Sequence, residues 1–272
     1  MNALTSGDRA QRLRLVSGLV LFSFAAAHFS NHALGIWSVE AMETAQQWRT
    51  AVTRSLPGFL VLTSALGLHI ALGLYKLVGR ESWRMPLWEA AQIGLGLAIP
   101  FFLLPHIVFT GVAHNLFGFD DRYFNSLNNI WPGVAWQQSA LLLLVWTHGC
   151  VGLHFWLRLS PTYRLIAPVL LVIAVLVPTL GLAGFIVAAR DVEATVAANP
   201  AAGAFMARED LLVLFDLSNL LKTGTVAIWL ILLAVLMFRL VRRYYASGKI
   251  SIAYAAGPAV RTMPGPTPVS YT

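Results

Sequence analysis

Long apolar runs alternate with shorter polar stretches along the whole chain. Six of these runs reach the roughly 20 residues that an α-helix needs to cross about 30 Å of hydrocarbon. They span roughly residues 12 to 36, 57 to 78, 88 to 113, 137 to 158, 165 to 189 and 218 to 241. The pattern therefore predicts an all-α, polytopic membrane protein with six transmembrane helices.

The composition supports this class. Of the 272 residues, 57% are hydrophobic and 11% are charged, whereas a soluble domain carries about 25% charged residues. A chain of this kind cannot bury its apolar surface within itself. The first apolar run is too long for a signal-peptide core and no convincing cleavage site follows it, so we expect it to be retained.

Charged residues are distributed unevenly between the two sides of the predicted bundle. With the N-terminus inside, inner segments hold 13 of the 19 Lys and Arg residues and only 3 of the 12 acidic residues. The positive-inside rule then places both termini in the cytoplasm, and we expect a multi-pass protein of the bacterial cytoplasmic membrane. The net charge of +7 is thus a topology signal and does not indicate a nucleic-acid partner.

The connections between the runs differ in character. We expect residues 37 to 56 and 190 to 217 to be outer loops, and residues 114 to 136, which are aromatic and rich in Asn, to fold over the helix ends as a lid. Pro100 and Pro105 predict a kink just before His106. Residues 1 to 11 are a cytoplasmic lead, and residues 12 to 245 form the membrane domain.

The last segment, residues 246 to 272, has a different composition. Residues 249 to 254 alternate polar and apolar side chains, as a strand does, and Gly and Pro follow. A lone strand is not stable. We therefore expect either the start of a cytoplasmic domain that continues beyond residue 272 or a disordered linker.

Four consecutive apolar runs each carry a histidine near the middle of the membrane. These are His28, His69, His106 and His148, separated by 41, 37 and 42 residues. A neutral imidazole in hydrocarbon costs roughly 2 to 7 kcal/mol unless its ring nitrogens find partners. Something must therefore occupy each ring.

Repeated glycine spacings sort these histidines into two pairs. A glycine (Gly18 or Gly96) precedes His28 and His106 by ten residues, and another (Gly73 or Gly152) follows His69 and His148 by four. Neutral imidazole suits iron, and two axial histidines would satisfy a flat macrocycle. The chain has one cysteine, Cys150, and no CxxCH motif, so any haem would be non-covalent.

Further polar groups near the helix ends could bind a haem propionate or a quinone. His32 lies one turn beyond His28 and is the expected substitute for it as a ligand. The alternative for each of these polar residues is a structural role. For Lys222 that role is to extend its side chain (to snorkel) outward toward Asp216. The candidates are His32, Asn31, Asp216 and Lys222 on the outer side and His154 and Arg158 on the inner side, with His114 a further outer histidine.

The motifs resemble those of the dihaem cytochrome b anchor of succinate:quinone oxidoreductases. That family shows HxxxGxY, a Gln fourteen residues before a His, and HxxxG on successive helices. Here these read His69-x3-Gly73-x-Tyr75, Gln92 to His106, and His148-x3-Gly152. The resemblance covers roughly residues 12 to 190. It implies two haem b groups, one held by His28 and His106 and the other by His69 and His148.

A sixth helix and the cytoplasmic extension depart from the usual five-helix anchor of that family. In this respect the chain resembles the six-helix N-terminal anchor of bacterial class III adenylate cyclases. By that resemblance, residues 249 to 272 of this chain would be the first strands of a ferredoxin-like domain. The resemblance implies a redox receptor that exchanges electrons with quinone, forms a homodimer and regulates a fused cyclase. The chain itself carries no cyclase catalytic residues.

Two other functions are considered. The chain could be the membrane subunit of a succinate dehydrogenase or fumarate reductase complex, whose basic inner face docks an iron-sulfur protein. It could also be a proton or metal transporter that uses the histidines without haem. Haem content and co-purifying subunits distinguish the three.

Overall fold

Six helices in the computed structural model are long and apolar enough to cross a membrane. The structure describes residues 9–80, 84–203, 205–247, 251–256 and 259–264. Large apolar side chains are exposed along these helices, for example on α3 (Leu56–Val78), α8 (Pro161–Ala198) and α9 (Arg208–Ser247), as expected where lipid is the solvent. The chain is thus a multi-pass membrane protein, and the predicted number of spans is confirmed. The spans are Arg9–Ile36, Leu56–Val78, Leu87–Phe117, Ala135–Leu157, Pro161–Ala198 and Arg208–Arg243.

The chain divides into two compact units, residues 1–223 and 224–272. The first unit is entirely helical where it is described. Its elements are α1 (Arg9–Ala33), η1 (Leu34–Ile36), α2 (Val39–Thr53), α3 (Leu56–Val78), α4 (Leu87–Ile107), the π-helical turn η2 (Val108–Val112), α5 (Ala113–Phe117), α6 (Tyr123–Ile130), α7 (Ala135–Leu157), α8 (Pro161–Ala198), η3 (Pro200–Ala202) and the start of α9 (Arg208–Ser247).

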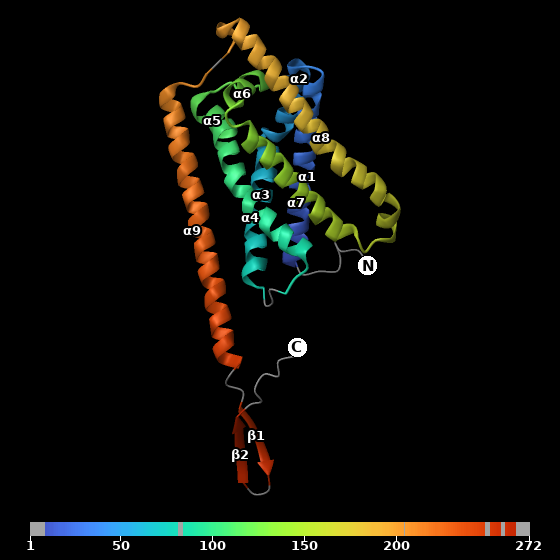
Figure 1. Ribbon diagram of the computed structural model, residues 1–272, viewed down its shortest axis with the longest axis vertical. Coiled ribbons are helices and arrows are strands. Elements are labelled where there is room, and N and C mark those ends of the chain that lie inside the picture. The colour runs from blue at the N-terminus through green and yellow to red at the C-terminus, as the bar shows by residue number, and fades with distance from the viewer. Residues whose placement is uncertain (1–8, 81–83, 204, 248–250, 257–258, 265–272) are drawn as a thin grey trace. The chain divides into compact units, whose positions relative to one another are not determined.

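Four helices of the first unit form its bundle (Figure 1). Among the described residues, α1 packs against α3, α4 packs against α7, and α1 also contacts α7, whereas α8 lies along α1. α1 and α4 run in one direction and α3 and α7 in the other. Two pairs of antiparallel helices therefore enclose the interior where the histidines lie.

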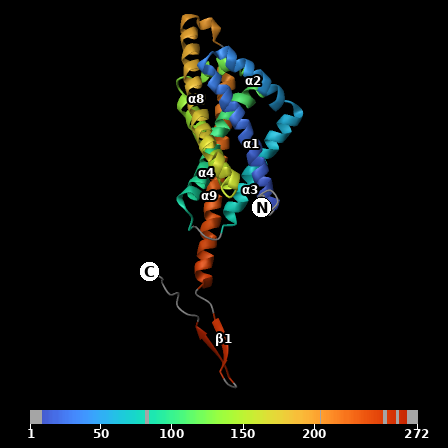
Figure 2. The same ribbon diagram turned by 90° about the vertical axis from the view of Figure 1, so that its right-hand side faces the viewer.

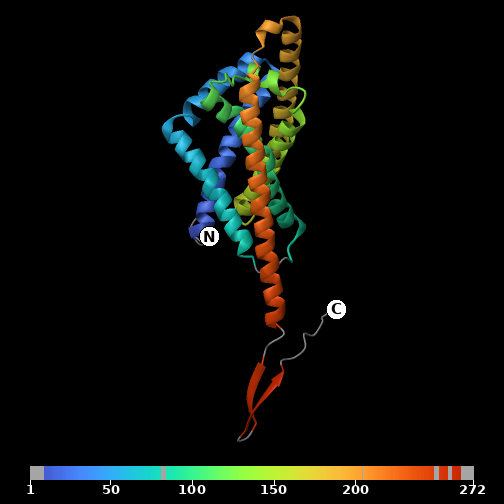
Figure 3. The same ribbon diagram turned by 90° about the vertical axis from the view of Figure 1, so that its left-hand side faces the viewer.

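A short helix occupies the stretch that we expected to be an outer loop at residues 37 to 56. α2 begins because the Ser38 side chain accepts a hydrogen bond from the Ala41 N–H, and Ser55 with Pro57 then starts α3. Figures 2 and 3 show α2 crossing the end of the bundle between α1 and α3. The expectation of a loop here was wrong, because an N-cap signal at Ser38 was overlooked.

The predicted lid at residues 114 to 136 contains α6, which packs on α2 and α8. Gln46 on α2 donates to the Asp121 carbonyl (3.0 Å), and Glu43 accepts from the Phe124 N–H (3.1 Å). Beneath these bonds a cluster of buried side chains joins the three helices. Its members are Val39, Met42, Tyr123, Leu127, Phe185, Ala188, Ala189 and Val192. The lid is therefore a packed cap over this end of the bundle.

Close backbone contact joins α8 to the end of α1. A β-carbon at Gly35 would lie 2.4 Å from the Gly184 carbonyl oxygen, and one at Gly184 would lie 2.1 Å from the His32 carbonyl oxygen. Only glycine fits at such an approach. α8 is also longer than the predicted run of 165 to 189. It continues to Ala198 and forms one wall of the cap.

Both prolines of α4 are accommodated within the helix, and the irregular backbone comes after His106. α4 continues through Pro100 and Pro105 to Ile107, and η2 follows at Val108–Val112. π-Helical turns are rare and often occur at functional sites. The predicted kink was expected before His106, whereas the break from α-helical hydrogen bonding lies after it.

The second unit contains the rest of α9 and a β-hairpin. Strands β1 (Ser251–Ala256) and β2 (Ala259–Pro264) pair antiparallel, with Ser251 opposite Pro264 and Ala256 opposite Ala259. β1 overlaps the predicted strand at 249 to 254, of which residues 249 and 250 lie outside the described residues, as do residues 1 to 8 of the predicted lead.

Candidate functional site

The four mid-membrane histidines meet as two pairs, as the glycine spacings suggested. His28 on α1 and His106 on α4 form the first pair, with ring centroids 6.1 Å apart and an angle of 55° between the ring planes. His69 on α3 and His148 on α7 form the second pair, at 6.2 Å and 89°. Both pairs lie within the first unit, so one bundle positions all four rings.

Each pair bridges two helices that do not pack against each other. Within the described residues, the closely packed helix pairs are α1 with α3 and α4 with α7, not α1 with α4 or α3 with α7. The paired rings therefore reach toward each other across the bundle interior from opposite helices. A ligand between two such rings would lie in the bundle interior, between helices on opposite sides.

One histidine of each pair has its Nδ1 held by an oxygen. The His106 Nδ1 is 2.9 Å from Gln138 Oε1, and the His69 Nδ1 is 3.1 Å from the Arg14 carbonyl oxygen. A carbonyl oxygen only accepts, so Nδ1 carries the proton in both rings and Nε2 keeps its lone pair. This is the tautomer in which histidine binds a metal through Nε2 while an outer partner orients the ring.

The other histidine of each pair has a buried ring nitrogen without a partner. The Nδ1 atoms of His28 and His148 are inaccessible to solvent and make no hydrogen bond within the described part of the chain. Leaving a buried polar atom unsatisfied costs roughly 1–3 kcal/mol. Each pair thus combines one oriented ring with one ring that lacks a polar partner.

Two of the glycines singled out in the sequence lie against rings of the second pair. A β-carbon at Gly18 would lie 2.9 Å from Cε1 of His69, and one at Gly96 would lie 3.1 Å from Cε1 of His148. Gly18 and Gly96 thus contact the second pair, although each stands ten residues before a histidine of the first. Ten helical residues rise about 15 Å, so this spacing measures the separation of the two pairs along the bundle.

The Gln92 side chain lies beside His148 and Gly152. Its Nε2 donates to the His148 carbonyl oxygen (3.1 Å), and it would lie 3.4 Å from a β-carbon at Gly152. That separation is an ordinary van der Waals contact, so the glutamine does not require glycine at this position. A β-carbon at Gly73 would meet nothing within 4 Å, so neither glycine of the four-residue spacing is required by a neighbouring side chain.

The ring separation within each pair leaves room for one shared metal ion. Two imidazoles that both bound one iron at about 2 Å would have their ring centroids about 6.2 Å apart, because each centroid lies about 1.1 Å behind its nitrogen. The two separations, 6.1 and 6.2 Å, agree with that value. A pair offers only two nitrogens, so the metal would need its remaining ligands from a macrocycle.

His32 is close to the first pair but faces other partners. Its ring is 4.7 Å from that of His28 and lies edge-on to Tyr123 (5.4 Å) and Phe185 (6.0 Å). Its Nδ1 is buried and makes no hydrogen bond among the described residues. The ring contact to His106 belongs to His28, so the geometry favours His28 over His32 as the partner of His106.

A cation from α2 lies beside the first pair, and sequence reasoning missed it. Arg49 is near enough to interact electrostatically with His28, His32 and His106. Its Nε donates to Asn31 Oδ1 (3.4 Å), while the Asn31 side chain donates to the Met42 carbonyl (2.8 Å). Asn31 is 4% exposed. Its side chain therefore holds Arg49 and α2, and both of its polar atoms are engaged.

Burial and ion pairs at Asp120 and Asp121 determine the electrostatics of the cap. Burial raises the pKa of the Tyr123 phenol to about 12. On the surface, a hydrogen bond from Arg122 lowers the pKa of the Asp120 carboxyl and raises that of the guanidinium itself. Arg54 and His114 both approach Asp121, His114 at 3.6 Å. His114 also bonds to the Phe119 carbonyl, so its partners lie within the cap.

The remaining predicted site residues are not gathered around either pair. His154 bonds through Nδ1 to the Tyr163 hydroxyl (2.7 Å), and the Arg158 guanidinium lies over the rings of Trp88 and Phe155. Both interactions join helix ends. Among the ion pairs of the described residues, none joins Lys222 to Asp216, so the expected snorkelling contact is not formed.

Gln138 and Arg14 are the other partners that the sequence did not reveal. Gln138 precedes His148 by ten residues on α7, the same interval that separates the levels of the two pairs on α1 and α4. Counting this interval back from His148 would have placed Gln138 beside His106. The Arg14 contact uses a backbone carbonyl, which no side-chain pattern can indicate.

Comparison with known proteins found no match to any family model, curated protein or solved structure. The class defined by the fold is therefore a six-span membrane protein with two histidine pairs inside its bundle.

Proposed function

We propose that the bundle is a dihaem b membrane domain of the succinate:quinone oxidoreductase type. The observation that carries the proposal is the pair of ring separations, 6.1 and 6.2 Å, each between helices on opposite sides of the interior. His28 with His106 and His69 with His148 would be the axial ligands. When bound, the haems would supply reversible one-electron transfer.

The chain's own groups have defined roles in this proposal. Gln138 and the Arg14 carbonyl orient one ring of each pair and raise its basicity. Gly18 and Gly96 keep the space beside the second pair free of side chains. Arg49 supplies positive charge next to the first pair, where it favours reduction or pairs with a propionate. Apolar helices exclude water from both sites.

For the whole protein we propose a redox or quinone receptor that regulates a fused cytoplasmic adenylate cyclase. The protein would lie in the bacterial cytoplasmic membrane, with both termini in the cytoplasm. Support comes from α9, a continuous helix of 40 residues that begins in the first unit and ends in the second, where the hairpin follows. A change in the first unit could reach the second through this helix. Such coupling requires a differential interaction with two states.

A visible absorption spectrum tests the dihaem proposal, with haem counted per chain. We expect about two haems with low-spin bis-histidine bands, and one haem after His69→Ala or His148→Ala. His154→Ala, which removes a histidine outside the pairs, is the matched control and should retain both. Protein that binds no haem after supplementation would overturn the proposal. Co-purification of a flavoprotein and an iron-sulfur subunit would instead assign the same core to a respiratory complex.

A further inference from the structure

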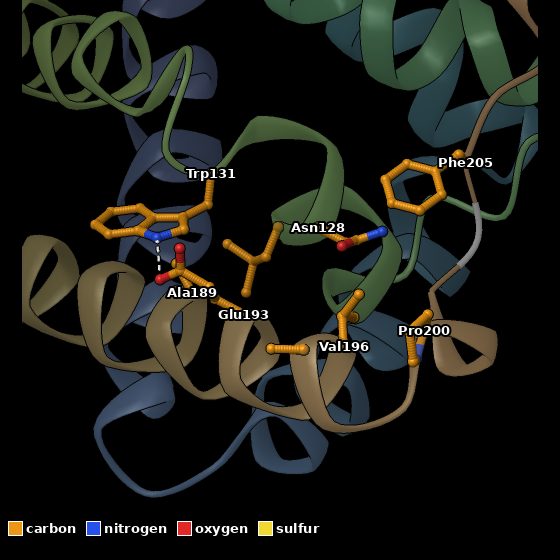
Figure 4. Close-up of a pocket in the computed structure, with 9 residues that line it drawn as sticks. Asn128, Trp131, Ala189, Glu193, Val196, Pro200 and Phe205 are labelled. Carbon is orange, nitrogen blue, oxygen red and sulfur yellow. Dashed lines mark hydrogen bonds between the residues drawn. The ribbon is translucent and has the colours of Figure 1, made fainter.

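A cavity of about 370 Å³ lies in the cap of the first unit. It is bounded by α6 and α8 and by the segment that follows α8, as Figure 4 shows. Residues that matter for its chemistry are Leu127, Asn128, Trp131, Glu193, Val196 and Phe205. Its volume falls within the range of small-molecule sites, about 300–1,000 Å³.

The walls suit a flat ring. Trp131 and Phe205 stand at opposite ends of the cavity, with Val196 between them. Aromatic and aliphatic walls favour a planar apolar ligand. None of the lining residues is basic, so the headgroup of an anionic lipid would find no counter-charge there.

Two polar groups on these walls can bind oxygens of such a ring. The Asn128 Nδ2 is buried and makes no hydrogen bond within the described residues, so it offers a free donor. Glu193 Oε2 accepts from the Trp131 indole N–H (2.8 Å), which leaves its second oxygen as an acceptor. One ligand oxygen must therefore accept a hydrogen bond and another must donate one, which describes a quinol.

Aromatic rings connect the cavity wall to the first histidine pair. The ring centroids of Trp131 and Phe185 are 6.5 Å apart, those of Phe185 and His32 are 6.0 Å apart, and those of His32 and His28 are 4.7 Å apart. A ligand in the cavity would therefore lie three ring contacts from the first histidine pair. The series also gives His32 a place between that pair and the cavity.

The α8 surface also provides a path for a hydrophobic tail. Ile186, which is 40% exposed, lies one turn before Ala189 on the same helix face as Glu193. Since Ile186 belongs to a predicted membrane span, a chain attached to the ring could leave the cavity along this face into lipid.

We propose that this cavity binds the headgroup of a membrane quinol, with Asn128 donating to one oxygen and Glu193 accepting from the other hydroxyl. The inference deepens the proposed function and rests on it for the identity of the ligand. It places the quinol site away from Asn31, Asp216, Lys222, His154 and Arg158.

Binding, rather than turnover, provides the test. Anaerobic equilibrium binding of a decyl-substituted benzoquinol is measured on detergent-solubilised full-length protein, with haem content recorded separately. We expect Ala197→Phe, which fills the cavity, and Asn128→Leu each to weaken binding at least tenfold. Ala194→Phe, on the same helix but outside the cavity wall, is the matched control and should bind normally.

The outcomes distinguish a failure of the cavity assignment from a failure of the dihaem proposal. Normal quinol binding by Ala197→Phe or by Asn128→Leu would overturn the cavity assignment even if two haems are present, and so would equal losses in Ala197→Phe and Ala194→Phe. If the protein lacks haem but the binding pattern holds, the dihaem proposal fails and the cavity stands. In addition, Glu193→Gln should reduce the preference for quinol over quinone, because an amide can donate to a quinone carbonyl.

Discussion

Gly96 lies directly against the ring of His148, so that a β-carbon at Gly96 would stand 3.1 Å from Cε1 of the histidine. The contact joins α4 to α7 and sets how far the ring can turn. Gly18 stands in the same relation to His69, at 2.9 Å. Both glycines lie within regular helices, so a β-carbon at either position would require the neighbouring ring to shift.

Replacing Gly96 by Val should therefore remove one haem selectively. The added side chain displaces the His148 ring, and we expect haem content to fall from about two per chain to about one, with the first pair still loaded. Gly94→Val is the control, because a β-carbon at Gly94 meets nothing within 4 Å. Haem extraction and reduced-minus-oxidised spectra provide the measurement. Retention of both haems in Gly96→Val would count against His148 as a ligand.

His32→Ala should retain both haems. The ring of His32 contacts Tyr123 and Phe185, while the 6.1 Å contact to His106 is made by His28. His28→Ala, by contrast, should lose the haem of the first pair. The reverse result, with haem lost from His32→Ala and kept in His28→Ala, would show that His32 is the ligand.

Arg49→Gln should lower the midpoint potential of the first-pair haem. A nearby cation disfavours the more positive ferric state, so its removal stabilises that state. At about 10 Å and an effective dielectric constant of about 20, a unit charge contributes roughly 1.7 kcal/mol, which corresponds to about 70 mV for one electron.

A potentiometric titration resolves the two haems of Arg49→Gln. The second-pair haem should shift less than half as much, by about 30 mV, since Arg49 interacts with His28, His32 and His106 and the second pair lies about 15 Å farther along the bundle. Arg54→Gln, at the end of the same helix with its partner Asp121, is the control. An unchanged first-pair potential would exclude an electrostatic role for Arg49.

Alkaline pH should weaken the cap through Tyr123. In the unfolded chain the phenol ionises near its ordinary pKa of 10.0, whereas burial raises the pKa to about 12 in the folded protein. The unfolded state therefore loses its proton first, and stability falls as pH rises from 10 to 12 by up to about 2.7 kcal/mol. Below pH 10 this contribution is fully present.

Tyr123→Phe isolates this effect. Thermal unfolding in detergent, followed by circular dichroism between pH 8 and 12, should show a loss of stability in the wild type that is smaller in the variant. At pH 8 the two proteins should be similar. Parallel pH profiles would mean that Tyr123 is accessible to water in the folded state.

The spans and the histidine pairs could be predicted from sequence, whereas the cap could not. The length of the apolar runs, about 20 residues, is set by the thickness of the bilayer and can be read from the sequence. His28, His69, His106 and His148 were conspicuous because each is a polar ring in an apolar run. α2 was mistaken for a loop because its pattern is polar and the N-cap at Ser38 was overlooked, and its packing on Tyr123 and Leu127 joins segments far apart in the sequence. Such contacts between distant segments leave no local signal.

The ten-residue intervals show that spacing in the sequence did not identify the contacts within the site. Gly18 and His28 were paired by spacing, yet Gly18 contacts His69. The interval reflects two levels along one helix, and only the neighbouring helices reveal which residue meets which. Gln138 was overlooked for this reason, although it bonds to His106.

The crossed arrangement of the histidine pairs bears on how the protein is assembled. Helix packing is closest between α1 and α3 and between α4 and α7, with a smaller contact between α1 and α7, whereas the ring pairs join α1 to α4 and α3 to α7. In the proposed holoprotein each iron would act as a cross-link between two independently inserted hairpins. Cofactor supply would then bear on biogenesis, because chains that failed to acquire both groups would be held together by the α1–α7 contact and by α8, without the two links through iron.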